Sequence, residues 1–416
     1  MNPQEKLQKI VRHAYETVPF YRKQFEENHL TPDDILITED LQKLPVLRKE
    51  QLQDEVHDHL SSRYSVQYMN GLLIEKRTSG STGKCLKIFW SISDSTLSDA
   101  GAWKYRGKWY GITPQDRYLS FHTTIYAGNR LIPNQEILEK EHGVNLSINK
   151  MNLHRANLQE YFQKIHEFRP VWILGQPSIL EILSSYLLEH HLSLESVRYL
   201  EMTGEYLTKS VRNHIAQAFP QAKIANMYGS NETGTIALEC PHGHMHLVES
   251  NAVVEIHKAH PEDEDGDVLV TSLRNTAMPI LHYALGDRAK MRTVSCEYAH
   301  SPVIEVTAGR VGQTIRLPNG EEKGCYVLLH PVEYINNDLN NPITQFQVVQ
   351  TAPDSFEVYL ALAPRFKNWK KAISEIYERE AGTAVGEGLH WNFHFEEKLF
   401  PDEHTGKLQF FKSELV

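Results

Sequence analysis

Residues 77–84 read Arg-Thr-Ser-Gly-Ser-Thr-Gly-Lys and combine hydroxyl side chains, two glycines and a lysine in one short stretch. Glycine lets a backbone approach a phosphate closely, and successive N–H groups form an anion-binding nest to which hydroxyls and an ammonium group add donors. The stretch therefore predicts a nucleotide as ligand. The candidate phosphate-binding residues are Thr78, Ser79, Gly80, Ser81, Thr82, Gly83 and Lys84.

The P-loop of NTPases is the nearest alternative for this stretch. A P-loop needs a glycine five residues before its Gly-Lys pair and a Ser or Thr directly after the pair. Thr78 and Cys85 hold these two positions, so the P-loop is excluded. A turn rich in serine and glycine can equally be an ordinary loop, so the assignment depends on the rest of the chain.

Length and composition exclude several classes of protein. A chain of 416 residues with 41% hydrophobic content predicts two or more domains. Its net charge of -10 and its scattered basic residues argue against nucleic acid as a partner. The first residues lack a signal-peptide pattern, and no apolar run is long enough to cross a bilayer, so we expect a cytoplasmic protein without a membrane partner. Four dispersed cysteines fit a reducing compartment.

Apolar periodicity predicts an α/β fold. Helical spacing over 4–18 ends at Pro19, and apolar segments at 171–174, 223–227 and 267–271 alternate with helix-like stretches. These stretches are 156–167, 178–189 and 208–218. We expect a large N-terminal domain of helix-covered β-sheets and, after the glycine-rich segment 309–324, a small mobile α+β C-terminal lobe. The predicted domains are 1–310 and 311–416. The acidic run 261–267 is expected to be a solvated turn without chemistry.

Three further motifs carry groups that suit a nucleotide. Asn226–Glu232 follows an apolar strand and places Tyr228 where an aromatic ring can stack on a base, with Glu232 as a carboxylate for Mg²⁺. Asp287 follows a glycine turn and can accept the hydroxyls of a ribose, although a Gly-Asp pair is also a common structural turn. Lys407 lies in a polar Thr-Gly-Lys loop, where a lone lysine is usually only solvated.

The order of these motifs resembles the adenylate-forming acyl-CoA synthetase superfamily, specifically the short branch that includes phenylacetate-CoA ligase and coenzyme F390 synthetase. The resemblance covers nearly the whole chain. It rests on TSGSTGK at 78–84, TGE at 203–205, NMYGSNE at 226–232, YALGD at 283–287, GR at 309–310, GK at 406–407, HAYETVPFYRKQF at 13–25, LPVLRKEQL at 44–52, GQPS at 175–178 and GDVLVTSLRNTAMPILHY at 266–283.

The resemblance implies an enzyme that uses ATP and Mg²⁺ to convert a carboxylic acid into an acyl-adenylate and pyrophosphate, then passes the acyl group to a thiol. It implies that 78–84 wraps the β- and γ-phosphates, that Glu232 binds Mg²⁺, and that Lys407 bridges the acid and the α-phosphate. The other nucleotide-binding residues that it implies are Gly204, Glu205, Tyr228, Gly229, Ser230, Asp287 and Arg310.

One departure from the family concerns the hinge. The family usually carries an acidic or lysine hinge residue shortly after the Gly-Arg pair, whereas this chain reads Gly-Arg-Val-Gly-Gln at 309–313. The loop 317–323 also lacks the usual pattern. The conformation for transfer to the thiol is therefore left open by the sequence.

The acid pocket of this branch is expected near 121–128 and 175–178. Aromatic side chains and a small glycine suit a flat ring, while a histidine or glutamine can meet ring hydroxyls, so an aromatic acid is the predicted substrate. The same aromatics could be ordinary core residues. The candidate acid-binding residues are Phe121, His122, Tyr126, Gly175, Gln176 and Ser178.

The acceptor and the reaction's end point have alternatives. Enzymes that use free CoA compete with aryl-acid-AMP ligases that load siderophore or antibiotic carrier proteins. An adenylyltransferase that stops at an AMP-linked product, and a non-catalytic nucleotide-binding homologue, are further alternatives. The oligomeric state is open, with a homodimer as one outcome.

A second metal is a separate hypothesis. Cys240, His246, Cys296 and His300 could bind Zn²⁺, with His242 and His244 nearby, because thiolate and imidazole suit tetrahedral zinc. Some relatives in the branch carry a structural zinc with cysteines in comparable places. The spacing is loose, so surface histidines without a metal remain the alternative.

Overall fold

The computed structural model describes most of the chain, in two compact units. The first unit is Met1–Pro114 with Ala225–Arg310, and the second is Gln115–Ile224 with Val311–Val416. The predicted division into 1–310 and 311–416 stays a prediction; it shares the boundary after residue 310. The described residues are 2–54, 56–78, 86–122, 125–127, 130–132, 137–139, 143–149, 155–308, 314–339, 342–400 and 408–415.

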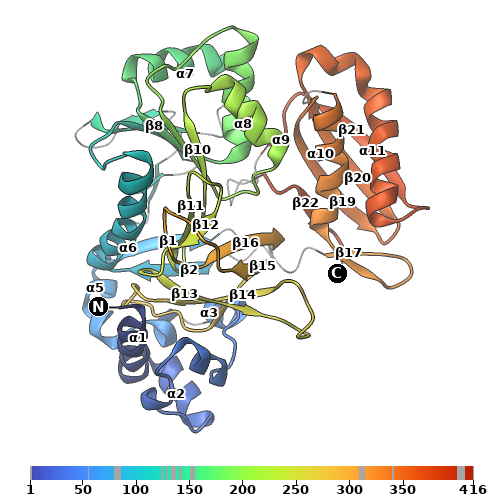
Figure 1. Ribbon diagram of the computed structural model, residues 1–416. Helices are drawn as coiled ribbons and strands as arrows, with labels where there is room; N and C mark the ends of the chain where they lie inside the picture. Colours follow the sequence, from blue (N-terminus) through green and yellow to red (C-terminus); the bar gives the residue numbers. More distant parts are fainter. Residues whose placement is uncertain are drawn as a thin grey trace. The chain divides into compact units, whose positions relative to one another are not determined.

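The first unit begins with helices and continues into antiparallel strands (Figure 1). The strand order is β13-β14-β15-β16-β12-β11-β10, and β1 and β2 form a separate hairpin. Its helices are α1 (Pro3–Thr17), α2 (Pro19–Glu27), η1 (Pro32–Asp34), η2 (Thr38–Lys43), α3 (Lys49–Asp54), α4 (Val56–His59), η3 (Ser62–Tyr64), α5 (Ser65–Met69), α6 (Ile92–Tyr105) and the π-helix η4 (Arg106–Tyr110). Its strands are β1 (Ile74–Thr78), β2 (Leu86–Trp90), β10 (Lys223–Ser230), β11 (Gly234–Glu239), β12 (Met245–Leu247), β13 (Ala252–His257), β14 (Gly266–Ser272), β15 (Tyr283–Arg292) and β16 (Val303–Ala308).

The second unit contains a mostly parallel sheet and a four-stranded sheet. In the first, β9, β8, β3 and β7 are parallel neighbours and β6 is antiparallel to β7. Its helices are α7 (Arg155–Phe168), α8 (Pro177–Glu189), α9 (Lys209–Ala218), η7 (Cys325–Leu328), α10 (Leu329–Asp338), η8 (Pro364–Trp369) and α11 (Lys370–Val385). Its strands are β3 (Tyr118–His122), β4 (Ile125–Ala127), β5 (Arg130–Ile132), β6 (Ile137–Glu139), β7 (Asn145–Asn149), β8 (Trp172–Gly175), β9 (Tyr199–Thr203), β17 (Thr314–Arg316), β18 (Glu322–Gly324), β19 (Ile343–Ala352), β20 (Ser355–Leu362), β21 (His390–Glu396) and β22 (Phe411–Ser413).

Local signals explain why α1 forms where the sequence predicts a helix. Asn2 caps the first turn by accepting from the Glu5 N–H at 2.8 Å, and Pro3 provides the fixed φ that suits a first helical residue. Leu7, Ile10, Val11 and Ala14 lie on one face and are buried. The predicted helices at 156–167, 178–189 and 208–218 correspond to α7, α8 and α9, and the predicted strands correspond to β8, β10 and β14. The α/β prediction is thereby confirmed.

Apolar side chains gather into separate cores. One core joins the N-terminal helices to β2 and β11–β16, and a second lies between α7–α9 and the parallel strands. The residues from Ile315 to Phe411 share a core of their own, formed where α10 and α11 pack on the sheet β21-β20-β19-β22 (Figure 1). No described helix combines the length and the apolar character needed to span a membrane. The cytoplasmic location and a homodimer stay predictions.

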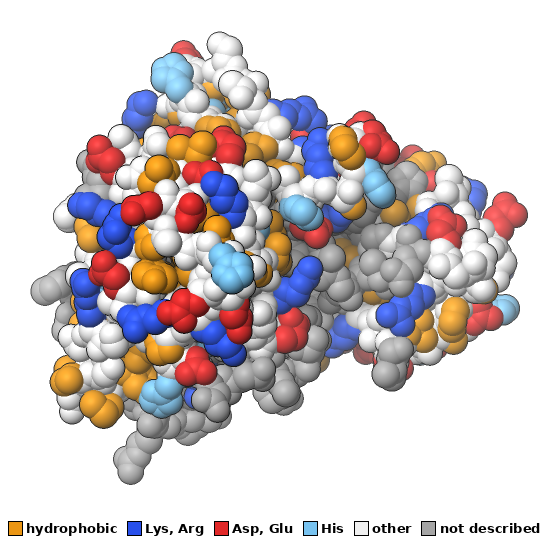
Figure 2. Space-filling model, turned by 90° about the horizontal axis from the view of Figure 1, so that it is seen from below, with side chains coloured by type: hydrophobic (Ala, Val, Ile, Leu, Met, Phe, Trp, Pro, Cys, Tyr) orange, Lys and Arg blue, Asp and Glu red, His pale blue; other side chains and the backbone are white. Residues whose placement is uncertain are grey.

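The surface carries both signs of charge. On the face shown in Figure 2, Lys and Arg side chains are interspersed with Asp and Glu side chains. On this face, the described side chains therefore form no extended positive patch.

Candidate active site

The β1–β2 hairpin carries the stretch that predicts phosphate binding. Its register pairs Ile74 with Trp90 and Thr78 with Leu86, so the two strands lead into and out of residues 79–85. Ser79, Gly80, Ser81, Thr82, Gly83 and Lys84 lie outside the described residues, and of Thr78 only the backbone is described. The indole N–H of Trp90, a fully buried residue, donates to the carbonyl of Asn231 at 2.9 Å. The hairpin is therefore tied directly to the loop after Tyr228.

Tyr228 and Asp287 form a hydrogen-bonded pair from β10 and β15. The Tyr228 hydroxyl donates to Asp287 Oδ2 at 2.7 Å. Burial raises the pKa of Tyr228 well above its ordinary value, and the charges of Asp287 and Glu232 raise it further. The phenol therefore stays neutral and acts as a donor, which fixes one face of the Asp287 carboxylate.

Glu232 lies beside this pair. Its side chain is buried, with 7% of the residue exposed, and Oε1 accepts a hydrogen bond from the Tyr283 hydroxyl at 3.2 Å. Tyr283 begins β15, the strand that carries Asp287. A buried carboxylate with one neutral donor keeps acceptor capacity for a divalent cation, so its chemistry fits Mg²⁺.

Gly229 and Ser230 shape the turn between Tyr228 and Glu232. The β10–β11 register shifts at Tyr228/Gly229, and a Cβ on Gly229 would stand 2.8 Å from the carbonyl oxygen of Gly234. Only glycine allows this approach. Ser230 Oγ accepts from the Thr233 N–H at 3.2 Å and closes the turn.

Two further nucleotide-binding candidates lie in the second unit. Gly204 follows β9 and has a φ of +83°, a conformation that favours glycine. Glu205 accepts hydrogen bonds from the backbone N–H and the hydroxyl of Ser178, each at 3.0 Å. Its carboxylate therefore lies at the N-terminus of α8, where the helix dipole favours negative charge.

The acid-pocket candidates gather at the ends of parallel strands in the same unit. A Cβ on Gly175 would stand 3.2 Å from the ring of Phe121, so the ring lies against the backbone at the end of β8. His122 ends β3, and its Nδ1 is 2.8 Å from Ser147 Oγ. Gln176 precedes the first residue of α8, and Ser178 follows in its first turn. Ligands commonly bind at this edge of α/β sheets. Tyr126 belongs to β4, of which only the backbone is described.

Two other predicted residues cannot be placed. Arg310 and Lys407 lie outside the described residues. Trp90 and Tyr283 are contacts that the sequence analysis did not single out. Tyr283 opens the YALGD motif, so that motif carried a signal, whereas no local pattern points to the contact of Trp90 with a residue 141 positions away.

Three of the four predicted zinc ligands lie close together, and His244 takes the place of the fourth, His300. Cys240, His244, His246 and Cys296 offer ligand atoms that all lie within 4.8 Å of one another, whereas His300 is not in this group. The two sulfurs are 3.9 Å apart. Two thiolates about 2.3 Å from a tetrahedral zinc are about 3.8 Å apart, so the spacing fits the ion.

The histidines of this metal group are oriented for coordination. His246 Nδ1 donates to the Ser301 carbonyl at 3.0 Å, which leaves Nε2 as the nitrogen with a lone pair. His246 Nε2 and His244 Nδ1 are buried and have no hydrogen-bond partner among the described residues. Cys240 and Cys296 are buried free thiols. The donor set therefore fits Zn²⁺ on its own geometry.

The π-helix η4 holds the two segments that carry these cysteines. Lys108 Nζ and the Trp109 indole N–H both donate to the Tyr298 carbonyl, at 2.8 and 3.2 Å. The Tyr110 hydroxyl donates to the Glu239 carbonyl at 2.5 Å. Glu239 immediately precedes Cys240, and Tyr298 follows Cys296 by two residues, so one helical turn clamps both sides of the metal group.

Comparison with known proteins identifies the family. Protein CapK of Staphylococcus aureus is 21% identical over 417 residues, covering 98% of this chain and 87% of that protein. Phenylacetate-coenzyme A ligase of Thermus thermophilus is 24% identical over 326 residues, covering 70% of this chain and 66% of that enzyme. The fold matches the crystal structure of 2-hydroxyisobutyryl-CoA ligase in the postadenylation state with a TM-score of 0.75 at 15% identity, over 99% of this chain and 89% of that one. The family described as AMP-binding enzyme matches residues 3–253. Since this match spans more than half of the chain, the protein belongs to the AMP-binding enzymes, the adenylate-forming superfamily that the sequence motifs predicted.

Proposed function

We propose that this chain activates a carboxylic acid with ATP as an acyl-adenylate, releases pyrophosphate, and transfers the acyl group to a thiol. The carrying observation is the set of three contacts within one unit: Trp90 to Asn231, Tyr228 to Asp287, and Tyr283 to Glu232. These contacts bring together the hairpin that flanks the phosphate stretch, the predicted base-stacking tyrosine and both functional carboxylates. Family membership and relatives that are CoA ligases support the same reaction.

In the adenylation step, the acid's carboxylate oxygen attacks the α-phosphorus of ATP, and the bond to the β-phosphate oxygen breaks to release pyrophosphate. Both reactants are anions, so preorganised donors and positive charge provide most of the rate acceleration. Glu232 would hold Mg²⁺, which neutralises charge on the phosphates. Asp287, oriented by Tyr228, would accept the ribose hydroxyls, and Lys407 would bridge the acid and the α-phosphate.

For the acid, we propose an aromatic substrate. Gly175 lets the Phe121 ring lie directly against the backbone at the end of β8, and this ring offers an aromatic surface on which a flat acid can stack. The phenylacetate-CoA ligases among the relatives support this class. The acceptor thiol is that of CoA or of a carrier protein's phosphopantetheine, and assays with each acceptor separate the two.

The test is acid-dependent exchange of labelled pyrophosphate into ATP, with Mg²⁺ and a panel of benzoic and phenylacetic acids. We expect exchange with at least one aromatic acid, and exchange with none would refute the proposal.

Lys407→Ala should slow adenylation by about 100-fold or more, since removal of one transition-state donor costs that much. Lys371→Ala is the matched control, because this lysine of α11 is 91% exposed and pairs only with Glu375 among the ion pairs described. An AMP-linked product without a thioester would favour an adenylyltransferase, and ATP binding that Lys407→Ala leaves intact without any exchange would favour a non-catalytic homologue.

For the metal group, we propose a structural Zn²⁺ on Cys240, His244, His246 and Cys296. The convergent ligand atoms and the buried, unpaired imidazole nitrogens support it. Protein purified without added metal should contain about one zinc per chain by elemental mass spectrometry. His244→Ala should lose the zinc and lower the melting temperature, whereas His300→Ala should keep both. Equal zinc content in the two variants would contradict the ligand assignment.

A further inference from the structure

Asp287 lies in an irregular part of β15. Between the pairs Leu269–Ala284 and Asp267–Arg288, β14 advances by two residues while β15 advances by four. The extra residues form a β-bulge that contains Asp287, and Gly286 within it has a φ of +84°. Bulges re-aim side chains next to active sites, and they need support because ladder hydrogen bonds are lost.

The neighbouring strand is irregular at the same level. Arg288 pairs with Ala308 and Ala289 pairs with Val306, so Thr307 is an extra residue on β16. Two bulges therefore flank Arg288, one on its own strand and one on β16. Thr307 also lies close in sequence to the Gly-Arg pair at 309–310.

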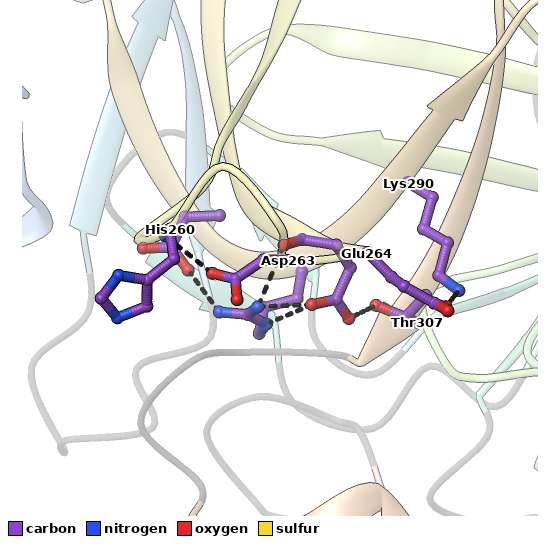
Figure 3. A network of polar contacts seen from close by, with 8 residues as sticks. His260, Asp263, Glu264, Lys290 and Thr307 are labelled. Carbon is purple, nitrogen blue, oxygen red and sulfur yellow. Dashed lines mark hydrogen bonds and ion pairs between the residues drawn. The ribbon is translucent and has the colours of Figure 1, made fainter.

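One carboxylate connects both bulges. Asp265 lies in the turn before β14. Its Oδ1 accepts hydrogen bonds from Arg288 Nε, at 3.1 Å, and from Arg288 Nη2. Its Oδ2 accepts a hydrogen bond from the Thr307 hydroxyl at 2.5 Å. Arg288 Nη2 donates to the Asp265 carbonyl at 3.2 Å as well, and Nη1 lies 3.5 Å from Asp267. Figure 3 shows this network, with Thr307 pointing into it from β16. The Asp265 side chain is 25% exposed, so the network is partly shielded from water.

We propose that Asp265 is a positioning residue that holds the bulge so that Asp287 faces the ribose of the bound nucleotide. This inference rests on the proposed function, in which Asp287 accepts the ribose hydroxyls. The Tyr228 hydroxyl fixes the Asp287 carboxylate from one side, and Arg288, held by Asp265, fixes the backbone at the next residue. With one anchor on each side, Tyr228 and Asp265, the bulge has little freedom to turn.

A neighbouring pair in the same turn provides a matched control. Glu264 pairs with Lys290, and its side chain is 83% exposed. Lys290 is also on β15, but it lies beyond the bulge and has no contact with Thr307 among the interactions described. Glu264→Gln removes the same charge from the same turn and leaves both bulges supported.

The experiment measures how well the full chain distinguishes ATP from 2′-deoxy-ATP and 3′-deoxy-ATP, by titration calorimetry. The wild type should prefer ATP, and Asp287→Ala should abolish the preference. Asp265→Asn should reduce the preference about tenfold by weakening ATP binding, because a displaced partner loses charge-assisted hydrogen bonds, with a smaller loss for each deoxynucleotide, which keeps one of the two hydroxyls. Glu264→Gln should keep the wild-type ratio. The double variant with Asp287→Ala should match Asp287→Ala alone, since coupled residues are not additive.

The outcomes separate this inference from the proposed function. A wild type that does not bind ATP overturns the proposed function and this inference with it. ATP preference that depends on Asp287 but is unchanged in Asp265→Asn overturns the inference alone, as does equal weakening of all three nucleotides. If Asp265→Asn does not fold by circular dichroism, Thr307→Val, which removes one of the two contacts, decides the matter: a smaller reduction of the preference supports the inference, and an unchanged ratio overturns it.

Discussion

Replacing Glu255 with glutamine should raise the free energy of unfolding above that of the wild type, and this gain should be larger at alkaline pH than at acidic pH. Glu255 lies on β13, with 17% of its side chain exposed, and its Oε2 has no hydrogen-bond partner among the described residues. Burial raises the pKa of Glu255 from the ordinary 4.5 to about 7, and repulsion from Glu39 contributes further. The folded chain therefore disfavours the charged form.

The pH dependence follows from proton binding. Between about pH 4.5 and pH 7 the folded state holds a proton on Glu255 that the unfolded state has lost, so the free energy of unfolding falls as the pH rises through this window. Each pKa unit corresponds to about 1.4 kcal/mol, so the full cost above pH 7 is about 3 kcal/mol. His282 Nε2 lies 4.0 Å away, but burial lowers the pKa of His282, so this ring is neutral there and does not offset the charge.

The assay is urea unfolding of wild type and Glu255→Gln at pH 5 and pH 8. We expect the variant to exceed the wild type by about 3 kcal/mol at pH 8 and by much less at pH 5. Glu262→Gln, at an exposed position in the turn that follows β13, should track the wild type at both values. A stability difference for Glu255→Gln that is equal at the two pH values, or larger at pH 5, would refute the reasoning.

Two other substitutions test the nucleotide side of the site. Tyr228→Phe removes the hydroxyl that donates to Asp287, so the KM for ATP in pyrophosphate exchange should rise about tenfold while the fold is retained; an unchanged KM would contradict this role. Trp90→Phe leaves the Asn231 carbonyl without its indole donor, which should cost about 1–3 kcal/mol of stability in thermal or urea unfolding, and a loss well below 1 kcal/mol would show that the contact contributes little.

The elements with local signals could be predicted from the sequence. A capped start, a proline at the first turn and apolar residues at helical spacing specify α1 without help from the rest of the chain. Family motifs likewise pointed to Tyr228, Glu232 and Asp287. Tyr228 donates to Asp287, and Glu232 accepts from Tyr283, which lies on the same strand as Asp287. These residues could be named from the sequence because each lies within a short motif that is recognisable by itself.

Contacts between distant segments could not be predicted in the same way. The zinc hypothesis names six cysteines and histidines between residues 240 and 300, and spacing alone does not say that His244 rather than His300 lies near the two thiols. The acidic turn 261–267 has the composition of a solvated loop, yet Asp265 bonds to two strands that follow it by 23 and 42 residues. Only the register of β14, β15 and β16 makes that bridge visible.

The π-helix η4 has a consequence for how an ion would arrive. Because Lys108, Trp109 and Tyr110 hold both cysteine-bearing segments through backbone carbonyls, these contacts keep the sulfurs and imidazoles close together without help from an ion. Zinc binding would then require little ordering of the backbone, because the ligand atoms are already held close together. Deleting one residue from η4 would turn the side chains that follow the deletion around the helix axis, and these contacts to the two cysteine-bearing segments would be lost.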